Sequence, residues 1–213
     1  MQTRKEKYFY YLSIIFIVCV VIANVIAGRL IQIGSLQLPA SILVFPITFI
    51  IGDLLTEIYG FKKALKVTII GFLSNLLLTG VCLIAVNLPA PETWELSMAY
   101  SQVFSYTPRI FIGSFSAFLI GSIVNSYLMV LLKRLTKGRL FWLRTILSTL
   151  IGEFLDSFIF CFISFVGVLV FKDIMLMILL QASIKILYEI LFTPILYLLR
   201  SKILKKEDIS IEQ

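Results

Sequence analysis

The 213-residue sequence contains no histidine and only three cysteines. The absence of histidine removes the side chain that most often serves as a general base, a metal ligand or a proton relay near neutral pH. Cys19, Cys82 and Cys161 are isolated within apolar stretches and show no CxxC spacing, so we expect neither a disulfide framework nor a zinc site. The sequence predicts no metal and no cofactor, and any proton transfer must use carboxylates or lysine.

Charged residues are also scarce, at 15% of the chain, whereas 60% of the residues are hydrophobic and the mean hydropathy is +1.01. A soluble globular domain has about 45–50% apolar residues, so this composition excludes an ordinary soluble fold. The net charge of +7 does not indicate a nucleic-acid partner, because the basic residues form short clusters between long apolar runs. We predict a multi-pass protein of the cell (inner) membrane, with the lipid bilayer as its surroundings.

The apolar runs predict an all-α integral membrane fold with six transmembrane helices. All six form one domain covering 1–213, with expected ranges of about 8–31, 40–59, 64–86, 108–132, 140–171 and 174–199. The first run is longer than the h-region of a signal peptide, so we interpret it as a retained helix. The fifth is longer than one crossing needs, which predicts a tilt or a kink near Gly152 or Gly167.

Lysine and arginine residues gather on one side of the predicted helices. Fourteen of them lie in the two terminal segments and in the connections that follow the second and fourth helices, whereas Arg29 and Lys172 fall on the opposite side. Because short, positively charged loops stay in the cytoplasm, both termini should be cytoplasmic. The connections 32–39 and 87–106 then lie outside, and a homodimer is compatible with a bundle of this size.

Several ionisable side chains lie inside the predicted helices, where a charge is costly unless it faces the bundle interior or a wet cavity. Asp53 and Glu57 are four residues apart on the second helix, and Glu153 and Asp156 are three apart on the fifth, so each pair shares a helix face. Each stripe continues with a phenyl ring one turn away: Phe49 and Phe160. Carboxylates accept N–H bonds from an amidine-like edge and a phenyl ring covers a flat face, so these stripes suit a planar heterocycle.

Structural roles stay open for the other polar groups. Lys185 and Glu189, four apart on the last helix, could neutralise each other. Arg109 and Arg144, near predicted helix ends, could anchor at the membrane interface, and Asn24 could join two helices by a hydrogen bond. The two acids of the fifth helix have no cation nearby in the sequence, which favours a functional role for them.

Four segments carry distinctive motifs, in the following order along the chain. They are F-P-I-T-F-I-I-G-D-L-L-T-E-I-Y-G at 45–60, R-I-F-I-G-S-F-S-A-F at 109–118, R-T-I-L-S-T-L-I-G-E-F-L-D-S-F-I-F at 144–160, and K-I-L followed by T-P between 185 and 194. Together they resemble the queuosine precursor transporter family, also called the vitamin-uptake-like transporters. The resemblance implies a six-helix fold similar to the substrate-binding components of energy-coupling-factor vitamin transporters. It also implies import of 7-deazaguanine precursors of the tRNA nucleoside queuosine.

The stripes and the resemblance together define an expected ligand site, with these members: Asn24, Phe49, Arg109, Glu153, Asp156, Phe160 and Lys185. A second set, nearer the cytoplasmic end, is expected to serve the gate or energy coupling: Asp53, Glu57 and Arg144. Lys185 would hold the acids ionised when no ligand is bound. Glu153 stands where the family pattern has an amide, and this additional acid would favour a ligand with a protonated amine over the neutral nitrile precursor. The resemblance alone does not select the precursor.

Two alternatives to an autonomous importer follow from the same residues. The first is the substrate-binding component of a vitamin or nucleobase uptake system driven by ATP-hydrolysing partner subunits, since the chain itself has no G-x-x-x-x-G-K-[ST] loop. The second is an intramembrane enzyme, against which the missing histidine argues; the sequence before Asp53 reads I-I-G-D rather than G-x-G-D. We therefore predict transport rather than catalysis, with energy coupling open between facilitated diffusion, proton symport and partner subunits.

Overall fold

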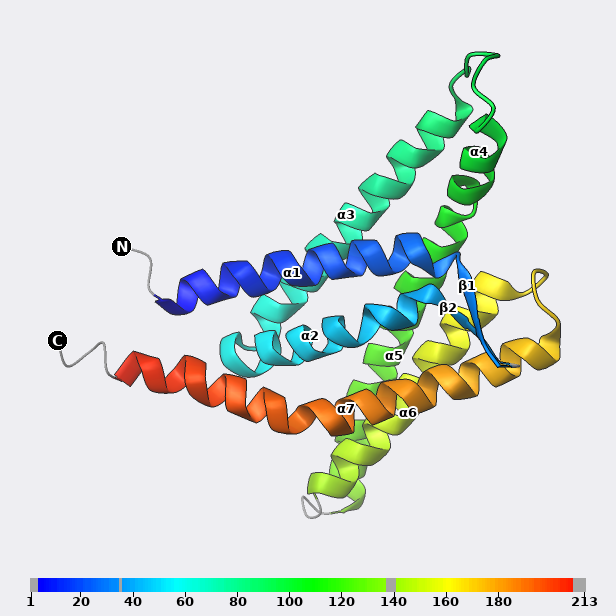
Figure 1. Cartoon of the computed structure of the whole chain (residues 1–213). Helices are drawn as coiled ribbons and strands as arrows, with labels where there is room; N and C mark the ends of the chain where they lie inside the picture. The colour runs from blue at the N-terminus through cyan, green and yellow to red at the C-terminus, as the bar shows by residue number, and fades with distance from the viewer. Residues whose placement is uncertain (1–3, 35, 137–140, 209–213) are drawn as a thin grey trace.

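The computed structural model of the chain describes residues 4–34, 36–136 and 141–208 (Figure 1). The described part is mostly helical: α1 (Arg4–Ala27), α2 (Phe45–Tyr59), α3 (Phe61–Asn87), α4 (Ser97–Ser105), α5 (Thr107–Leu135), α6 (Phe141–Phe165) and α7 (Phe171–Asp208). Between α1 and α2 lie an antiparallel hairpin, β1 (Leu30–Ile33) and β2 (Leu36–Pro39), and a short 3-10 helix, η1 (Ala40–Leu43).

Within the described residues, four stretches of helix are long and apolar enough to cross a membrane: Lys5–Ala27, Phe61–Asn87, Ser97–Gly121 and Phe171–Phe192. A further apolar stretch, Phe45–Thr56, is shorter than the roughly 20 residues that a crossing needs. The chain is a multi-pass membrane protein, and the six crossings with cytoplasmic termini stay a prediction.

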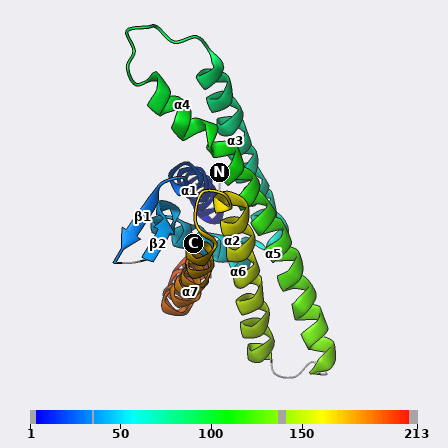
Figure 2. The same ribbon diagram turned by 90° about the vertical axis from the view of Figure 1, so that its right-hand side faces the viewer.

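Three helices form a layer in which α2 lies between α1 and α7 (Figure 1). The first turn of α1 and the last turn of α7 lie at the same end of this layer, and the β1-β2 hairpin lies at the opposite end (Figure 1). α5 and α6 form an antiparallel pair beside the layer, and α3 packs against α1 (Figure 2). Helices distant in the sequence, α2, α6 and α7, therefore surround the middle of the molecule.

Small residues allow α5 and α6 to approach closely. Gly113, Ala117 and Gly121 are one helical turn apart on α5. A Cβ atom added at Gly113 would lie 2.5 Å from Oγ of Ser164, and one added at Gly121 would lie 3.3 Å from Cβ of Asp156. Small residues at this spacing are a common means of tight helix packing in lipid. The contact fixes the position of Asp156 against α5.

Two clusters of buried apolar side chains hold the helices together. The cluster at the hairpin end joins α1, β2, α5, α6 and α7 through residues that include Leu38, Ile110, Phe165, Ile174 and Met177. The other joins α1, α2 and α3 through Phe16, Val20, Ile51, Leu55, Ala64 and Val67. Between lipid-facing helices such packing, rather than exclusion of water, provides much of the attraction.

The connection between the first two helices differs from the prediction. Leu30 and Ile31, expected at the end of the helix 8–31, begin β1, and the expected polar turn forms a strand pair. Alternation of Ile or Leu with Gln favours an extended, half-buried strand. The second helix begins at Phe45 rather than at residue 40, because Pro46 fits the first turn of a helix.

Three further features of the structure differ from the prediction. The fifth predicted helix, 140–171, ends at Phe165, since Gly167 adopts the left-handed φ of +79° that stops a helix. Its excess length is thus a turn rather than a tilt or kink. The connection 87–106, expected as a polar loop, contains α4, and α7 continues to Asp208, beyond the expected end at 199.

Candidate functional site

Charged side chains from α6 and α7 meet in the middle of the bundle. Nζ of Lys185 donates a hydrogen bond to Oδ2 of Asp156 and lies 3.3 Å from Oε2 of Glu153. Lys185 is only 7% exposed. An ion pair withdrawn from water is tolerated when contacts of this kind offset the loss of hydration. The acids of α6 therefore obtain from α7 the cation that their own segment lacks, and the side chain of Glu189, the alternative partner of Lys185, lies outside the described part of the chain.

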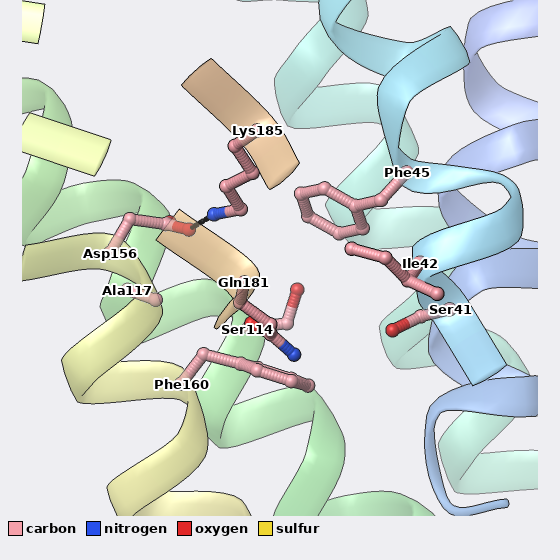
Figure 3. Close-up of a pocket in the computed structure, with 9 residues that line it drawn as sticks. All are labelled: Ser41, Ile42, Phe45, Ser114, Ala117, Asp156, Phe160, Gln181 and Lys185. Carbon is pink, nitrogen blue, oxygen red and sulfur yellow. Dashed lines mark hydrogen bonds and ion pairs between the residues drawn. The ribbon is translucent and has the colours of Figure 1, made fainter. Parts of the chain in front are cut away.

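Two aromatic rings of α2 flank the same ammonium group. Nζ of Lys185 lies 5.3 Å from the ring centroid of Phe45 and 5.3 Å from that of Phe49. The two rings are 5.2 Å apart and inclined at 64°, because residues four apart on a helix share one face. A cation over a phenyl face gains about 0.5–2 kcal/mol. The ammonium thus has carboxylates and aromatic faces as neighbours, of which Figure 3 shows Asp156 and Phe45.

A small cavity of about 20 Å³ opens beside this cluster. Figure 3 shows its lining residues: Ser41, Ile42, Phe45, Ser114, Ala117, Asp156, Phe160, Gln181 and Lys185. A cavity of this size has room for about one water molecule. Two rings, an amide, two hydroxyl groups and an ion pair line it, so it is a polar recess beside the ion pair rather than a pocket for a whole ligand.

A larger cavity, of about 340 Å³, lies between α1, α2, α3 and α5, and its volume is within the range of about 300–1,000 Å³ that ligand pockets have. Its lining is mostly apolar, and its polar members include Asn24, Asp53 and Asp156. The side-chain nitrogen of Asn24 donates to the carbonyl oxygen of Val20 at 2.9 Å, whereas its Oδ1 is buried without a hydrogen-bond partner. Three residues line both cavities: Phe45, Ser114 and Asp156. Asp156 therefore stands at the junction of the two.

Arg109 lies elsewhere, against the C-terminal end of α6. Its Nε donates to the carbonyl oxygen of Ile163 at 2.6 Å, and Nη2 donates to that of Val166. The neighbouring Tyr106 hydroxyl donates to the carbonyl oxygen of Ser164, and the guanidinium carbon lies 5.9 Å from the Tyr106 ring. The last carbonyls of a helix lack partners within the helix and attract a cation. Arg109 thus completes the end of α6 and lines neither cavity.

The structure brings most of the predicted ligand residues together. Members found at the ion-pair cluster or in the cavity linings are Asn24, Phe49, Glu153, Asp156, Phe160 and Lys185. Of the predicted gating residues, Asp53 lines the larger cavity, whereas the side chains of Glu57 and Arg144 lie outside the described part. Within the described residues, no group of three or more Cys, Asp or Glu side chains could hold a metal ion.

Six residues that line the smaller cavity were not among the predicted site residues: Ser41, Ile42, Phe45, Ser114, Ala117 and Gln181. Two of them carried a signal, because Gln181 precedes Lys185 by one helical turn and Phe45 precedes Phe49 by one. Ser41 could not have been found, since it lies in η1, where a regular helix was predicted. Ser114 looks like any small packing residue of a membrane helix.

Comparison with known proteins agrees with this picture of a membrane site. Residues 39–199 match the family model described as "Putative vitamin uptake transporter". A "Probable queuosine precursor transporter" of Bacillus subtilis (strain 168) is 30% identical over 150 residues, which are 70% of this chain and 65% of that protein. The "Queuosine precursor transporter" of Escherichia coli (strain K12) is 26% identical over 164 residues, 77% of this chain and 72% of that protein. No solved structure matches the chain significantly.

Proposed function

We propose, from the premise that this chain belongs to the vitamin uptake transporter family, that it imports 7-deazaguanine precursors of queuosine. The family is one of transporters and not of enzymes. Both relatives described above carry the name of queuosine precursor transporters, and the aligned region spans about two thirds of the first one's length. The proposal extends that named cargo to this chain.

One observation carries the proposal: a buried ion-pair cluster faces two cavities that meet at Asp156. Ionisable groups in a membrane protein are costly and are usually retained for a ligand or ion pathway. A cluster that served packing alone would need one acid for one cation. Here Lys185 contacts two acids, and unfilled space adjoins them.

The ligand is proposed to bind with N–H donors, those of its guanine-like edge or of a protonated amine, toward Glu153 and Asp156. Its flat ring would lie in the larger cavity against Phe49, with Phe160 in the lining of the small recess that also borders Asp156. Carboxylates accept two hydrogen bonds from adjacent N–H groups, and a ring face supplies contact without competing for them. Asn24 offers an unpaired acceptor farther along the route, while Arg109 is engaged by α6 and is left out.

The two cavities suggest a path in two stages. The smaller one borders η1 and the hairpin end, and the larger one follows α2 and the first half of α3 toward the other end of the molecule. Asp53 lies in that second stage, one turn beyond Phe49, where it would receive the ligand or a coupled proton. Glu57 and Arg144 are proposed to act with it at the inner gate.

Accumulation of labelled precursors tests the proposal. Cells without their own uptake or synthesis of these compounds would express the wild type, Asp156→Asn, or the matched control Asp173→Asn at the start of α7. We expect accumulation with the wild type and the control, and a loss of at least about tenfold with Asp156→Asn, since one charge-assisted hydrogen bond is worth about 1.5–3 kcal/mol. No accumulation above empty cells would contradict the proposal.

The partner-driven alternative is separated by reconstitution. Purified protein in liposomes contains no ATP-hydrolysing subunit, so uptake into them supports an autonomous importer. Uptake in the native host together with none in liposomes would favour the alternative, in which this chain is the substrate-binding component.

A further inference from the structure

The surroundings of the Lys185 ammonium form a complete binding site for a primary amine. Asp156 accepts its hydrogen bond, Glu153 lies 3.3 Å away, and the rings of Phe45 and Phe49 each lie 5.3 Å from Nζ. We call these four residues the ammonium cage. All four come from α2 and α6, whereas the cation in the cage belongs to α7.

The cage holds more than neutralisation of Lys185 requires. One carboxylate balances one ammonium, and a second acid adds a negative charge that must itself be kept out of lipid. Aromatic faces beside a cation are the usual means by which proteins recognise ammonium ligands. A structural ion pair needs neither feature, whereas a site selective for an amine needs both.

We infer that the ammonium cage binds the protonated primary amine of the transported ligand, and that Lys185 fills the cage while the ligand is absent. This rests on the proposed function and deepens it, because it selects the aminomethyl class of 7-deazaguanine over the nitrile class. Lys185 is then a tethered competitor, present at a high effective concentration. The ligand enters by exchanging one ammonium for another, so the acids never face the apolar interior without a cation.

The larger cavity, which Phe45, Phe49 and Asp156 of the cage line, fits the rest of such a ligand. With the amine in the cage, the heterocycle would extend along Phe49 toward Asn24, Thr48 and Ser114. An amide and two hydroxyl groups supply both donors and acceptors, as the mixed edge of a guanine-like ring requires. The unbranched stem of Lys185 allows its ammonium to withdraw into the adjoining empty space.

The competing assignment places the N–H edge of the heterocycle on the carboxylates. That edge is common to amine and nitrile ligands, so Lys185 would compete with both equally. The ratio of amine uptake to nitrile uptake at low concentration therefore distinguishes the two orientations, and it is independent of how much protein reaches the membrane.

The test compares Lys185→Met with the wild type, and Lys185→Met/Glu153→Gln with Glu153→Gln. In each pair only the tethered ammonium is removed, and the double variant also removes the charge of one of its two acidic partners. We expect the ratio of amine uptake to nitrile uptake to rise at least about tenfold in each pair. The reason is that the variants lose a competing ammonium that was held by a carboxylate and two aromatic rings. Methylammonium chloride should inhibit amine uptake by the Lys185→Met proteins and not by the wild type.

Lys185→Arg keeps the test decisive if the methionine variants do not insert into the membrane. A guanidinium stays charged and grips a carboxylate with two N–H groups, so it should remain in the cage and lower the ratio at least about tenfold. An unchanged ratio in Lys185→Met, or in Lys185→Arg where only that variant inserts, would overturn the inference. A wild type that transports neither ligand would instead contradict the proposed function.

Discussion

Two cations among the helices, Lys185 of α7 and Arg109 of α5, are neutralised in different ways. Lys185 contacts two carboxylates and two aromatic rings and lies beside an unfilled cavity. Arg109 donates to backbone carbonyl oxygens at the end of α6 and lines neither cavity. The partners of Lys185 are side chains, two of them ionisable, whereas those of Arg109 are backbone atoms.

The difference separates exchangeable charges from permanent ones. A carboxylate can accept hydrogen bonds from a ligand in place of a lysine, because the exchange keeps its charge compensated. A helix-end carbonyl that lost its arginine would stay unpaired in an apolar setting. This costs free energy, and no new contact offsets the cost. In a membrane helix, the partner of a cation therefore tells more about its role than its depth does.

The largest effect is expected from Lys185→Ala. It leaves Glu153 and Asp156 without the Lys185 ammonium, and breaking a buried pair costs about 3–5 kcal/mol of unfolding free energy. Thermal unfolding of the purified protein in detergent measures this, with the exposed Lys172→Ala as the control. Equal stability of the two variants would show that the cluster carries little of the fold, and adding Glu153→Gln should recover part of the loss.

Arg109→Gln should have a smaller effect and of another kind. Hydrogen bonds from a charged donor are worth about 1.5–3 kcal/mol, so stability should fall by about that amount as the end of α6 loses its partner. The KM for uptake should stay within about twofold of the wild type, with Arg29→Gln as the control. A raised KM at unchanged stability would show that Arg109 contributes to ligand binding, and would contradict the distinction drawn between Arg109 and Lys185.

The membrane class and most helices could be predicted from the sequence, since apolar runs of this length have few other uses. The hairpin could not, because Leu30 and Ile31 continue an apolar run and only pairing with β2 distinguishes strand from helix. The end of α6 could not be predicted either. Gly167 was proposed as the site of a kink, but its left-handed φ is a property of the folded chain.

Those parts of the site that lie on one face of a single helix could be predicted from residue spacing. Glu153 and Asp156 share a face, and so do Phe45 and Phe49, by spacing alone. Which faces meet is set by tertiary packing, so the pairing of Lys185 with the acids of α6 instead of Glu189 could not be derived from i, i+4 spacing. Arg109 misled for the same reason, because its carbonyl partners are more than fifty residues away in the sequence.

Gly113→Ala tests the scaffold common to both cations, because the α5-α6 contact positions Arg109 at one end and Asp156 in the middle. The added Cβ would lie 2.5 Å from Oγ of Ser164, and overpacking of this kind costs about 1–3 kcal/mol. Thermal unfolding should show the loss, and Ser164→Ala in the same chain should restore it. At Gly80, where nothing lies within 4 Å, alanine should be neutral or stabilising; destabilisation there as large as at Gly113 would reject the close-contact explanation.

The smallest expected effect isolates the aromatic part of the difference. Phe45→Leu removes one ring from the Lys185 ammonium and should lower stability by about 0.5–2 kcal/mol, measured by thermal unfolding beside the exposed Phe171→Leu. Shape changes contribute to that figure, so the decisive quantity is the coupling between Phe45→Leu and Lys185→Met in a double-mutant cycle. If the ring acts through the cation, the cost of Phe45→Leu falls once the ammonium is gone. If the cost of Phe45→Leu is unchanged in the Lys185→Met background, Phe45 only fills space. Lys185 then differs from Arg109 by its carboxylate partners alone.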